Sequence, residues 1–229
     1  MKYLLLPGLD GTGTLFEPFT AQAPSGSSCD VVSYPIDQNL SYAEYAQLIS
    51  SDFIPDESFV IVAESFSGPV AVLVGSTCPS ALVGVVLVNT FVFRAAWRGF
   101  SYLPWSLLFR LPLSRLTVGL HLTGFNHAPR FVGSIRAANA PVAPAVRASR
   151  LRSAFNVDVR NQLAALDVPV MYLRGSDDRL VFSSCVRRVV SARPSTTVVR
   201  IPGPHLLLQV EPQRSWQEVS SFVSSCCRA

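Results

Sequence analysis

Short apolar segments alternate with helix-like segments along most of this chain, and the alternation limits the folds available to it. The apolar segments are rich in β-branched residues, which is typical of strands buried on both faces. They span residues 3–6, 31–34, 59–63, 82–89, 170–174 and 197–201. Helix-like segments lie between most of them, at 42–51, 69–76, 182–192 and 213–225. Strands that alternate with helices predict an α/β fold, with a mostly parallel sheet of about six strands and helices on both faces.

Residues 93–156 interrupt this alternation. The segment contains no convincing strand, and it is rich in Trp, Phe, Leu and Arg, with prolines at intervals. This pattern predicts several short helices joined by turns. We therefore divide the chain into an α/β core, residues 1–92 and 157–229, and a helical cap, or lid, of residues 93–156. The alternative is that these helices are ordinary crossover connections of the sheet.

Charge is unevenly distributed along the sequence. The formal net charge is +4, 49% of the residues are hydrophobic and 15% are charged, a composition that excludes a disordered chain. No Asp or Glu occurs between Glu64 and Asp158. The arginines of that interval are Arg94, Arg98, Arg110, Arg115, Arg130, Arg136, Arg147, Arg150 and Arg152. The cationic cap either follows from genomic base composition or attracts an acidic partner.

The cysteine and apolar patterns constrain compartment, cofactors and partners. Five cysteines occur without repeat spacing, and no CxxC motif or Cys/His cluster is present. This favours free thiols in a reducing cytoplasm and predicts neither a metal site nor another cofactor. The apolar run 81–93 is too short to span a bilayer, so no transmembrane segment is predicted. The arginines are not interleaved in a known nucleic-acid-binding module, so no nucleic acid partner is predicted either.

The motif Ala63-Glu64-Ser65-Phe66-Ser67 lies between a predicted buried strand and a predicted helix. A nucleophilic serine of the Gly-x-Ser-x-Gly type needs this context, because a sharp strand-to-helix turn projects its Oγ above the sheet. Here both glycines are replaced by small residues, Ala63 and Ser67. Ser65 is the candidate nucleophile. Ser67 is the rival, because residues 65–69 form a looser version of the same pattern.

A glycine-rich loop, residues 7–13, follows the first predicted strand. It lacks the Lys-Ser/Thr of a P-loop and the spacing of a dinucleotide fingerprint. Acyl transfer, by contrast, needs two backbone N–H groups directed at the developing oxyanion. Phe66, the residue after the candidate nucleophile, is one candidate donor. Leu9 in the glycine-rich loop is the other, with Asp10 as its alternative.

An acidic pair, Asp177 and Asp178, follows the fifth predicted strand. A carboxylate just after a late strand can orient a histidine, and we favour Asp178, three residues after Gly175. The alternative is a strand-ending turn, in which Asp is common.

A histidine, His205, lies in a Gly/Pro loop after the last predicted strand. His121 and His127 lie in the predicted cap without a neighbouring acidic motif. The chain order Ser65, Asp178, His205 is the order of a nucleophile, an acid and a base that meet at the carboxyl ends of strands. We therefore predict that these residues form a catalytic triad.

These segments together resemble the α/β-hydrolase superfamily across nearly the whole chain. The resemblance rests on the motifs at residues 7–13, 64–68, 175–178 and 203–205. It implies an α/β-hydrolase fold and hydrolysis through an acyl-enzyme. His205 would accept the Ser65 proton, and Asp178 would hold the imidazole and stabilise its charged form.

Within the superfamily, the chain is similar to small bacterial carboxylesterases, which include the pimeloyl-acyl carrier protein methyl ester esterases of biotin synthesis. Such enzymes use lid arginines to engage an acidic carrier protein. The resemblance therefore implies a carboxylic ester as substrate, either a small molecule or an acyl group linked to a carrier protein. In the second case acyl carrier protein is the partner. The arginines expected to take part are Arg94, Arg98, Arg110 and Arg115.

The cap also supplies candidate substrate-binding residues, Phe93, Trp97, Arg94 and Arg98. The apolar ones either line an acyl pocket or merely pack the cap onto the sheet. Two other functions stay open. A thioesterase or an acyltransferase would use the same triad. A lipid- or membrane-surface binding protein would use the basic, apolar cap, and its nucleophile elbow, the strand-to-helix turn at Ser65, would be vestigial.

Overall fold

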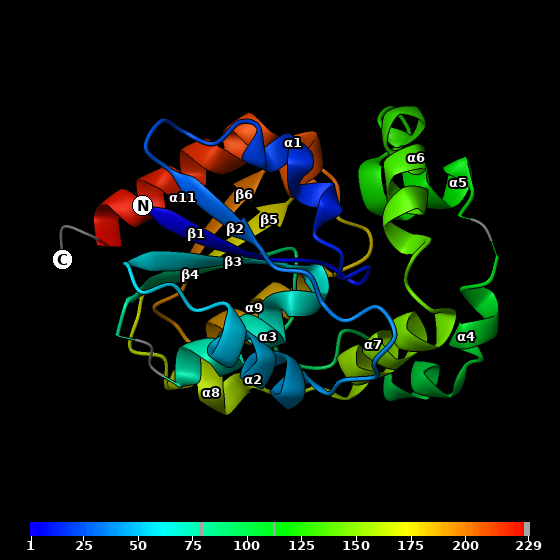
Figure 1. The fold of residues 1–229 in the computed structure, drawn as a ribbon, viewed down its shortest axis with the longest axis horizontal. Helices are drawn as coiled ribbons and strands as arrows, with labels where there is room; N and C mark the ends of the chain where they lie inside the picture. Colours follow the sequence, from blue (N-terminus) through cyan, green and yellow to red (C-terminus); the bar gives the residue numbers. More distant parts are fainter. Residues whose placement is uncertain (78–79, 112, 227–229) are drawn as a thin grey trace.

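A six-stranded parallel sheet forms the centre of the protein (Figure 1). The computed structural model describes residues 1–77, 80–111 and 113–226. The strands lie in the order β2-β1-β3-β4-β5-β6, and every neighbouring pair is parallel. Their bounds are β1 Lys2–Leu6, β2 Ser28–Val31, β3 Phe59–Glu64, β4 Leu82–Val88, β5 Val170–Gly175 and β6 Thr197–Ile201. The predicted parallel sheet of about six strands is confirmed.

The second strand differs from its predicted position at 31–34. It spans Ser28–Val31 and pairs with Lys2–Leu5 of β1. The apolar pattern misplaced it because β2 is an edge strand, where polar and exposed side chains are tolerated. The buried Val32 and Tyr34 that suggested a strand lie in the extended segment after it.

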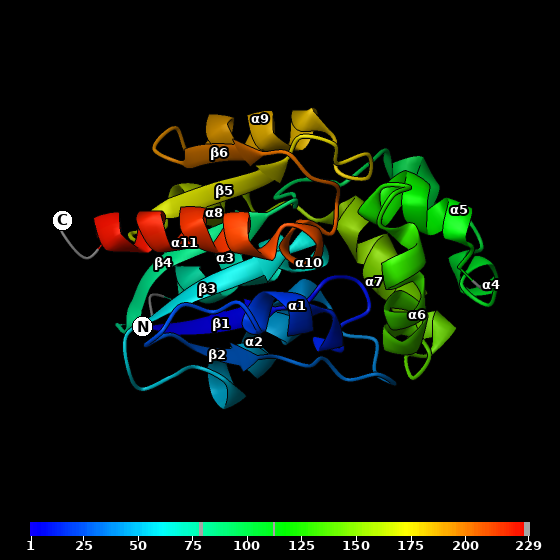
Figure 2. The same ribbon diagram turned by 90° about the horizontal axis from the view of Figure 1, so that it is seen from above.

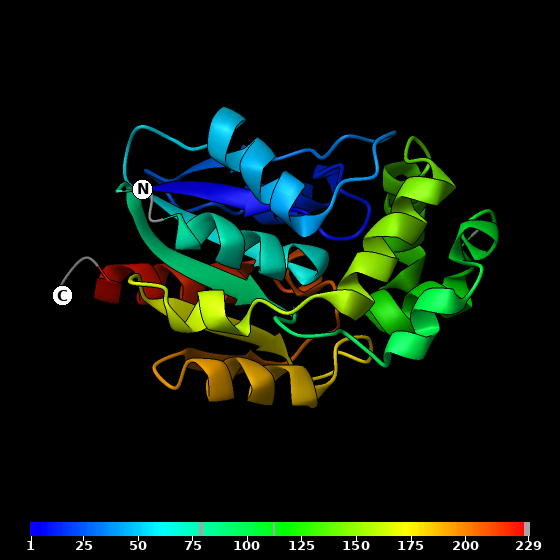
Figure 3. The same ribbon diagram turned by 90° about the horizontal axis from the view of Figure 1, so that it is seen from below.

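Helices cover both faces of the sheet. One face carries α2 (Tyr42–Asp52), α3 (Gly68–Ser76), α8 (Arg160–Ala164) and α9 (Ser183–Ala192), which lie in front of the sheet in Figure 3. The other face carries α1 (Glu17–Thr20), α10 (Leu207–Val210) and α11 (Pro212–Cys226), in front in Figure 2. Each layer of helices closes its own apolar cluster against the strands. The sheet is therefore buried on both faces, as its continuous apolar runs require.

Residues 93–156, which we call the cap segment, form helices at the end of the sheet toward which the strands run (Figure 1). They comprise a 3₁₀ helix at Arg98–Tyr102, α4 (Trp105–Leu108), α5 (Arg115–Val118), a π-helical turn at Gly119–Thr123, α6 (Ala128–Asn139) and α7 (Pro144–Asn156). In its described residues the segment contains no strand. An isolated antiparallel bridge joins Phe93, the first residue of the segment, to Asp158, two residues beyond its end.

Three further observations concern cysteines, metals and membranes. Cys29 and Cys185 are free thiols, whereas Cys78 and Cys227 lie outside the described residues. Among the residues described, no group of three or more His, Cys, Asp or Glu side chains could hold a metal ion. No helix in the described ranges combines the length and the apolar character needed to cross a bilayer.

Candidate active site

Ser65 lies at the sharp turn that joins β3 to α3. It follows the last residue of the strand, Glu64, and begins a 3₁₀ turn that leads directly into the helix. Its φ is 51°, a left-handed conformation that is uncommon for serine and that marks strained, functional turns. The hydroxyl of Thr90, beyond the end of β4, donates a hydrogen bond to the Ser65 carbonyl and supports this turn.

The close approach in this turn occurs at Gly68 rather than at the positions where elbow glycines are usual. A Cβ at residue 68 would overlap the Thr90 side chain. Ala63 and Ser67, which replace the elbow glycines, are both fully buried. A glycine one position later than the motif requires thus provides the space in which Thr90 reaches the strained serine.

The rival serine, Ser67, is bonded elsewhere. Its Oγ lies 2.7 Å from the Tyr34 hydroxyl and donates to the Pro7 carbonyl. The side chain is fully buried, at 0% exposed. These contacts connect Ser67 to the loop after β1 and to the segment after β2.

Two hydrogen bonds join Ser65, His205 and Asp178. The Ser65 Oγ lies 2.9 Å from His205 Nε2. On the other side of the imidazole ring, Nδ1 lies 3.1 Å from Asp178 Oδ1. His205 and Asp178 are buried, at 2% and 6% exposed. The three residues predicted from their chain order therefore meet, joined by hydrogen bonds in the order Ser65, His205, Asp178.

Of the two adjacent aspartates, Asp178 is the one that faces the histidine. Its Oδ1 also accepts hydrogen bonds from the amides of Leu180 and Val181, at 2.8 and 3.0 Å. Asp177 is exposed and uses its backbone amide to bind the Gly203 carbonyl at 2.9 Å. The turn that the sequence suggested as an alternative is present as well, and it is the turn that orients Asp178.

The loop that carries His205 is held by Asn89, a residue the sequence placed only at the end of a strand. Asn89 Nδ2 donates to the carbonyls of Pro204 and His205, at 3.0 and 2.8 Å, and its Oδ1 accepts from the Gly175 amide at 2.9 Å. The residue is fully buried with φ 43°. Asparagine adopts this conformation more readily than most residues. The one sequence feature that could have indicated this role is that Asn89 is a polar residue at the end of an otherwise apolar run.

Electrostatics at the site favour an ion pair between the imidazole and the carboxylate. Burial on its own lowers the pKa of His205, but the charge and hydrogen bond of Asp178, with a contribution from Glu64, raise it above its usual value. Burial raises the pKa of Asp178, yet the charge and hydrogen bond of His205 and the two backbone donors bring it below its usual value. The lowered pKa of Asp178 and the raised pKa of His205 thus favour the charged form of each group.

A second buried carboxyl group, that of Glu64, lies beside the triad. The side chain is 2% exposed, and its Oε2 accepts a hydrogen bond from Gln209 Nε2 at 3.2 Å. Burial raises the pKa of Glu64 to about 7, against the opposing effects of His205 and Gln209. In the sequence Glu64 is recognisable only as the residue before the candidate nucleophile. Nothing in the sequence indicates that Gln209 of α10 donates a hydrogen bond to it.

The glycine-rich loop after β1 lies against Ser65. A Cβ built on Gly8 would lie 3.9 Å from both the Ser65 Cβ and the Glu64 Oε2. The Gly11 amide donates to the Gly8 carbonyl at 3.1 Å and closes a tight turn. Neither the Leu9 nor the Asp10 amide donates to another residue in the described part of the chain. The two candidate donors of this loop thus have no bond to a described residue, which an oxyanion donor requires.

Solved structures share this architecture at low sequence identity. The enol-lactonase from Burkholderia xenovorans LB400 superimposes with a TM-score of 0.81 at 15% identity, over 97% of this chain and 91% of that one. MenH from S. aureus gives 0.78 at 14% identity, over 99% and 94%. A thermophilic esterase from Thermogutta terrifontis gives 0.76 at 17% identity, over 99% and 90%.

The chain has the α/β-hydrolase fold. No family model matches the sequence, and no curated protein sequence matches it either. Within this α/β-hydrolase fold, Ser65, Asp178 and His205 follow the ends of β3, β5 and β6.

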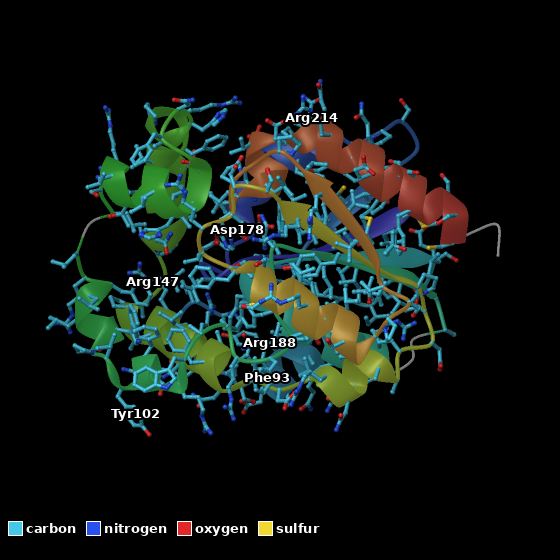
Figure 4. All side chains as sticks on the ribbon, turned by 180° about the vertical axis from the view of Figure 1, so that it is seen from behind. Phe93, Tyr102, Arg147, Asp178, Arg188 and Arg214 are labelled. Carbon is cyan, nitrogen blue, oxygen red and sulfur yellow. The ribbon has the colours of Figure 1, made fainter. Side chains whose placement is uncertain are left out.

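The cap residues predicted to bind substrate lie apart from these three. No hydrogen bond, ion pair or ring contact among the described residues joins Phe93, Arg94, Trp97 or Arg98 to the triad. The Phe93 ring lies under the guanidinium groups of Arg94, Arg160 and Arg188, at 4.9, 4.2 and 5.1 Å from its centroid. Figure 4 shows Phe93 beside Arg188 and well apart from Asp178. Substrate binding by these four residues stays a prediction.

Exposed apolar side chains gather in the cap segment. Tyr102, at 90% exposed, projects outward from its rim in Figure 4, and Trp97 is 75% exposed. The other exposed large apolar residues of the segment are Phe100, Leu103, Leu107, Leu108, Leu111, Leu116, Leu120 and Phe125. Clusters of this kind mark binding surfaces for proteins, lipids or apolar ligands.

Proposed function

We propose that this protein is a serine hydrolase that cleaves a carboxylic ester through an acyl-enzyme. The observation that carries the proposal is the hydrogen-bonded chain from Ser65 through His205 to Asp178, at 2.9 and 3.1 Å. The strained turn at Ser65 and the free amides of the neighbouring loop add support, because acyl transfer needs an exposed nucleophile and oxyanion donors.

The proposed reaction has two halves. His205 Nε2 takes the Ser65 proton as Oγ attacks the ester carbonyl, while the Phe66 and Leu9 amides bind the oxyanion. The tetrahedral intermediate collapses, and His205 donates that proton to the leaving alcohol. Water, activated by His205, then releases the acid and regenerates Ser65. Asp178 stays ionised throughout and stabilises the imidazolium.

The proposal is tested with p-nitrophenyl esters of graded acyl length. We expect hydrolysis that peaks at one acyl length and stops after treatment with a fluorophosphonate. Absence of turnover across the series, and across matching thioesters, would contradict it. In that case, liposome binding unchanged by Ser65→Ala would favour the second candidate, a lipid-surface binding protein, which the exposed apolar residues of the cap support.

We propose further that the acyl group is carried by an acidic carrier protein that docks on the cap. Arg98, Arg110 and Arg115 are exposed, and none of them forms an ion pair with a described residue. Unpaired arginines attract an acidic partner and speed its encounter, more strongly at low salt.

Charge reversal tests this docking. We expect Arg110→Glu combined with Arg115→Glu, two exposed arginines outside the predicted substrate-binding set, to lower kcat/KM for a carrier-linked acyl ester by about 10-fold at low salt. Turnover of a small p-nitrophenyl ester should stay near that of the unmodified protein. Equal losses on both substrates, or no loss on the carrier-linked ester, would contradict carrier docking and leave the hydrolase proposal standing.

The pH dependence gives a test of Glu64. Because the Glu64 carboxylate helps to raise the pKa of His205, Glu64→Gln should lower that pKa and move the acid limb of the kcat/KM profile to lower pH. Glu57→Gln is the matched control, since Glu57 pairs with Lys2 on the surface. An acid limb that stays in place in Glu64→Gln, or that moves equally in both variants, would contradict this role.

A further inference from the structure

Arg150, on helix α7 of the cap segment, is buried at 1% exposed and reaches the loop beside Ser65. Its Nη1 donates to the carbonyls of Leu9 and Asp10, at 3.0 and 2.6 Å. Its Nη2 donates to the Pro35 carbonyl at 2.9 Å, and its Nε to the Tyr45 hydroxyl at 2.9 Å. One side chain thus links the cap to the two residues that are candidate oxyanion donors.

No carboxylate in the described part of the chain forms an ion pair with this guanidinium. The charge is instead satisfied by three backbone carbonyls and one hydroxyl, and it lies 5.6 and 5.7 Å from the ring centroids of Tyr34 and Tyr45. Burial of a cation without a counter-ion is costly, and an apolar side chain of similar length would fill the space without that cost. Packing alone therefore does not explain an arginine at this position.

The loop is shaped to admit the guanidinium. Gly11 has φ 73°, and a Cβ at this position would overlap the Arg150 Nη1. A side chain here would both strain the turn and displace the arginine.

The contact also fixes the direction of the loop amides. In a trans peptide the C=O of one residue and the N–H of the next point in opposite directions. The bond from Arg150 to the Leu9 carbonyl therefore sets the direction of the Asp10 amide, and the bond to the Asp10 carbonyl sets that of the Gly11 amide. The Gly11 amide in turn donates to the Gly8 carbonyl, which sets the direction of the Leu9 amide. All the peptide groups around the candidate oxyanion donors are thereby held, with the Leu9 and Asp10 amides left unbonded to described residues.

We infer that Arg150 is a positioning residue for the oxyanion site. From the cap it holds the loop of residues 7–13 in the orientation that binds the oxyanion, so the seating of α7 and the formation of that site are coupled. The inference rests on the proposed hydrolase function. It assigns to this arginine a task distinct from the docking proposed for the exposed arginines of the cap.

The test compares Arg150→Met with Arg147→Met. Arg147 is a matched control because it lies one turn earlier on α7, is also buried, and bonds to Phe109 and Asn139 within the cap. Loss of one oxyanion donor costs about 10²–10³ in kcat. We expect Arg150→Met to lower kcat by about 10²-fold with KM changed less than about threefold, and Arg147→Met to keep kcat near that of the unmodified protein.

Two further readouts separate positioning from general stability. A trifluoromethyl ketone forms a tetrahedral oxyanion with the serine, so its Ki should rise in Arg150→Met as far as kcat/KM falls, whereas the Ki of the product acid should stay constant. Millimolar guanidinium should restore part of the activity of Arg150→Ala and none to Arg150→Ala carrying Ser65→Ala. Both readouts are taken where melting curves show the variants folded.

The outcomes distinguish failure of the positioning role of Arg150 from failure of the proposed hydrolase function. Activity of Arg150→Met within twofold of the unmodified protein would overturn the inference, as would equal losses in Arg147→Met or a trifluoromethyl ketone Ki that does not change. If none of the Arg150 variants folds, with guanidinium present or absent, the residue is structural and the inference fails. If the unmodified protein neither hydrolyses esters nor binds the ketone, the proposed function fails instead.

Discussion

Replacing Ser65 with alanine should reduce kcat on the best p-nitrophenyl ester by about 10⁶-fold, because the covalent route disappears entirely. His205→Ala should cost about as much, and the double variant hardly more, since the nucleophile and its base act as one unit. The measurement is steady-state hydrolysis with each variant purified from a host that lacks background esterase. Melting curves should show that Ser65→Ala remains folded, because alanine removes only the Oγ that bonds to His205 Nε2 at 2.9 Å.

Ser67 supplies the control for this result. Its hydroxyl bonds to Tyr34 and Pro7 and not to the histidine, so Ser67→Ala should alter stability more than chemistry. Loss of buried hydrogen bonds of this kind costs about 1–3 kcal/mol. Full activity in Ser65→Ala combined with total loss in Ser67→Ala would move the nucleophile by two positions and overturn the assignment.

Asp178→Asn should lower kcat by about 10³- to 10⁴-fold, the largest effect we expect after those of Ser65→Ala and His205→Ala. Asparagine keeps an oxygen for the Leu180 and Val181 amides, but it removes the charge that stabilises the imidazolium. The acid limb of the pH profile should also move to lower pH, since the Asp178 carboxylate raises the pKa of His205. Both kcat and its pH dependence are read from the same set of assays.

Asp177→Asn is the matched control, one position away and exposed. Asp177 uses its backbone rather than its carboxylate to hold the histidine loop, so kcat should stay within about twofold, as for most surface substitutions away from a site. A loss in Asp177→Asn as large as that in Asp178→Asn would contradict the assignment of the acid.

The sequence predicts the sheet well because its central strands are buried on both faces. Continuous apolar runs such as those of β3 and β5 are typical of strands buried on both faces, so they are recognisable in the sequence. Once the strands are known to be parallel, residues that follow their carboxyl ends must lie at one edge of the sheet. That geometry is why the order of Ser65, Asp178 and His205 predicted their meeting. The edge strand β2 lacks this signal because its side chains are exposed and polar. It was predicted at 31–34, three residues after its observed position at Ser28–Val31.

The supporting residues of the site could not be predicted, because their roles depend on contacts between distant segments. Glu64 meets Gln209 across 145 positions of sequence, and Arg150 meets Leu9 across 141. Asn89 joins β5 to the histidine loop through side-chain bonds that no local pattern reveals. Hydrophobic periodicity predicts which face of a helix or strand is buried, but it does not predict which residue pairs with a buried polar group.

The central claim is that Ser65 forms an acyl-enzyme, and mass spectrometry of protein quenched during turnover tests it most directly. With a p-nitrophenyl ester in excess, the intact mass should increase by that of one acyl group. Fragmentation should place the increment on Ser65, and Ser65→Ala should acquire none. An adduct on Ser67 or on a cysteine, or ester turnover by a protein that never carries an acyl group, would contradict the account.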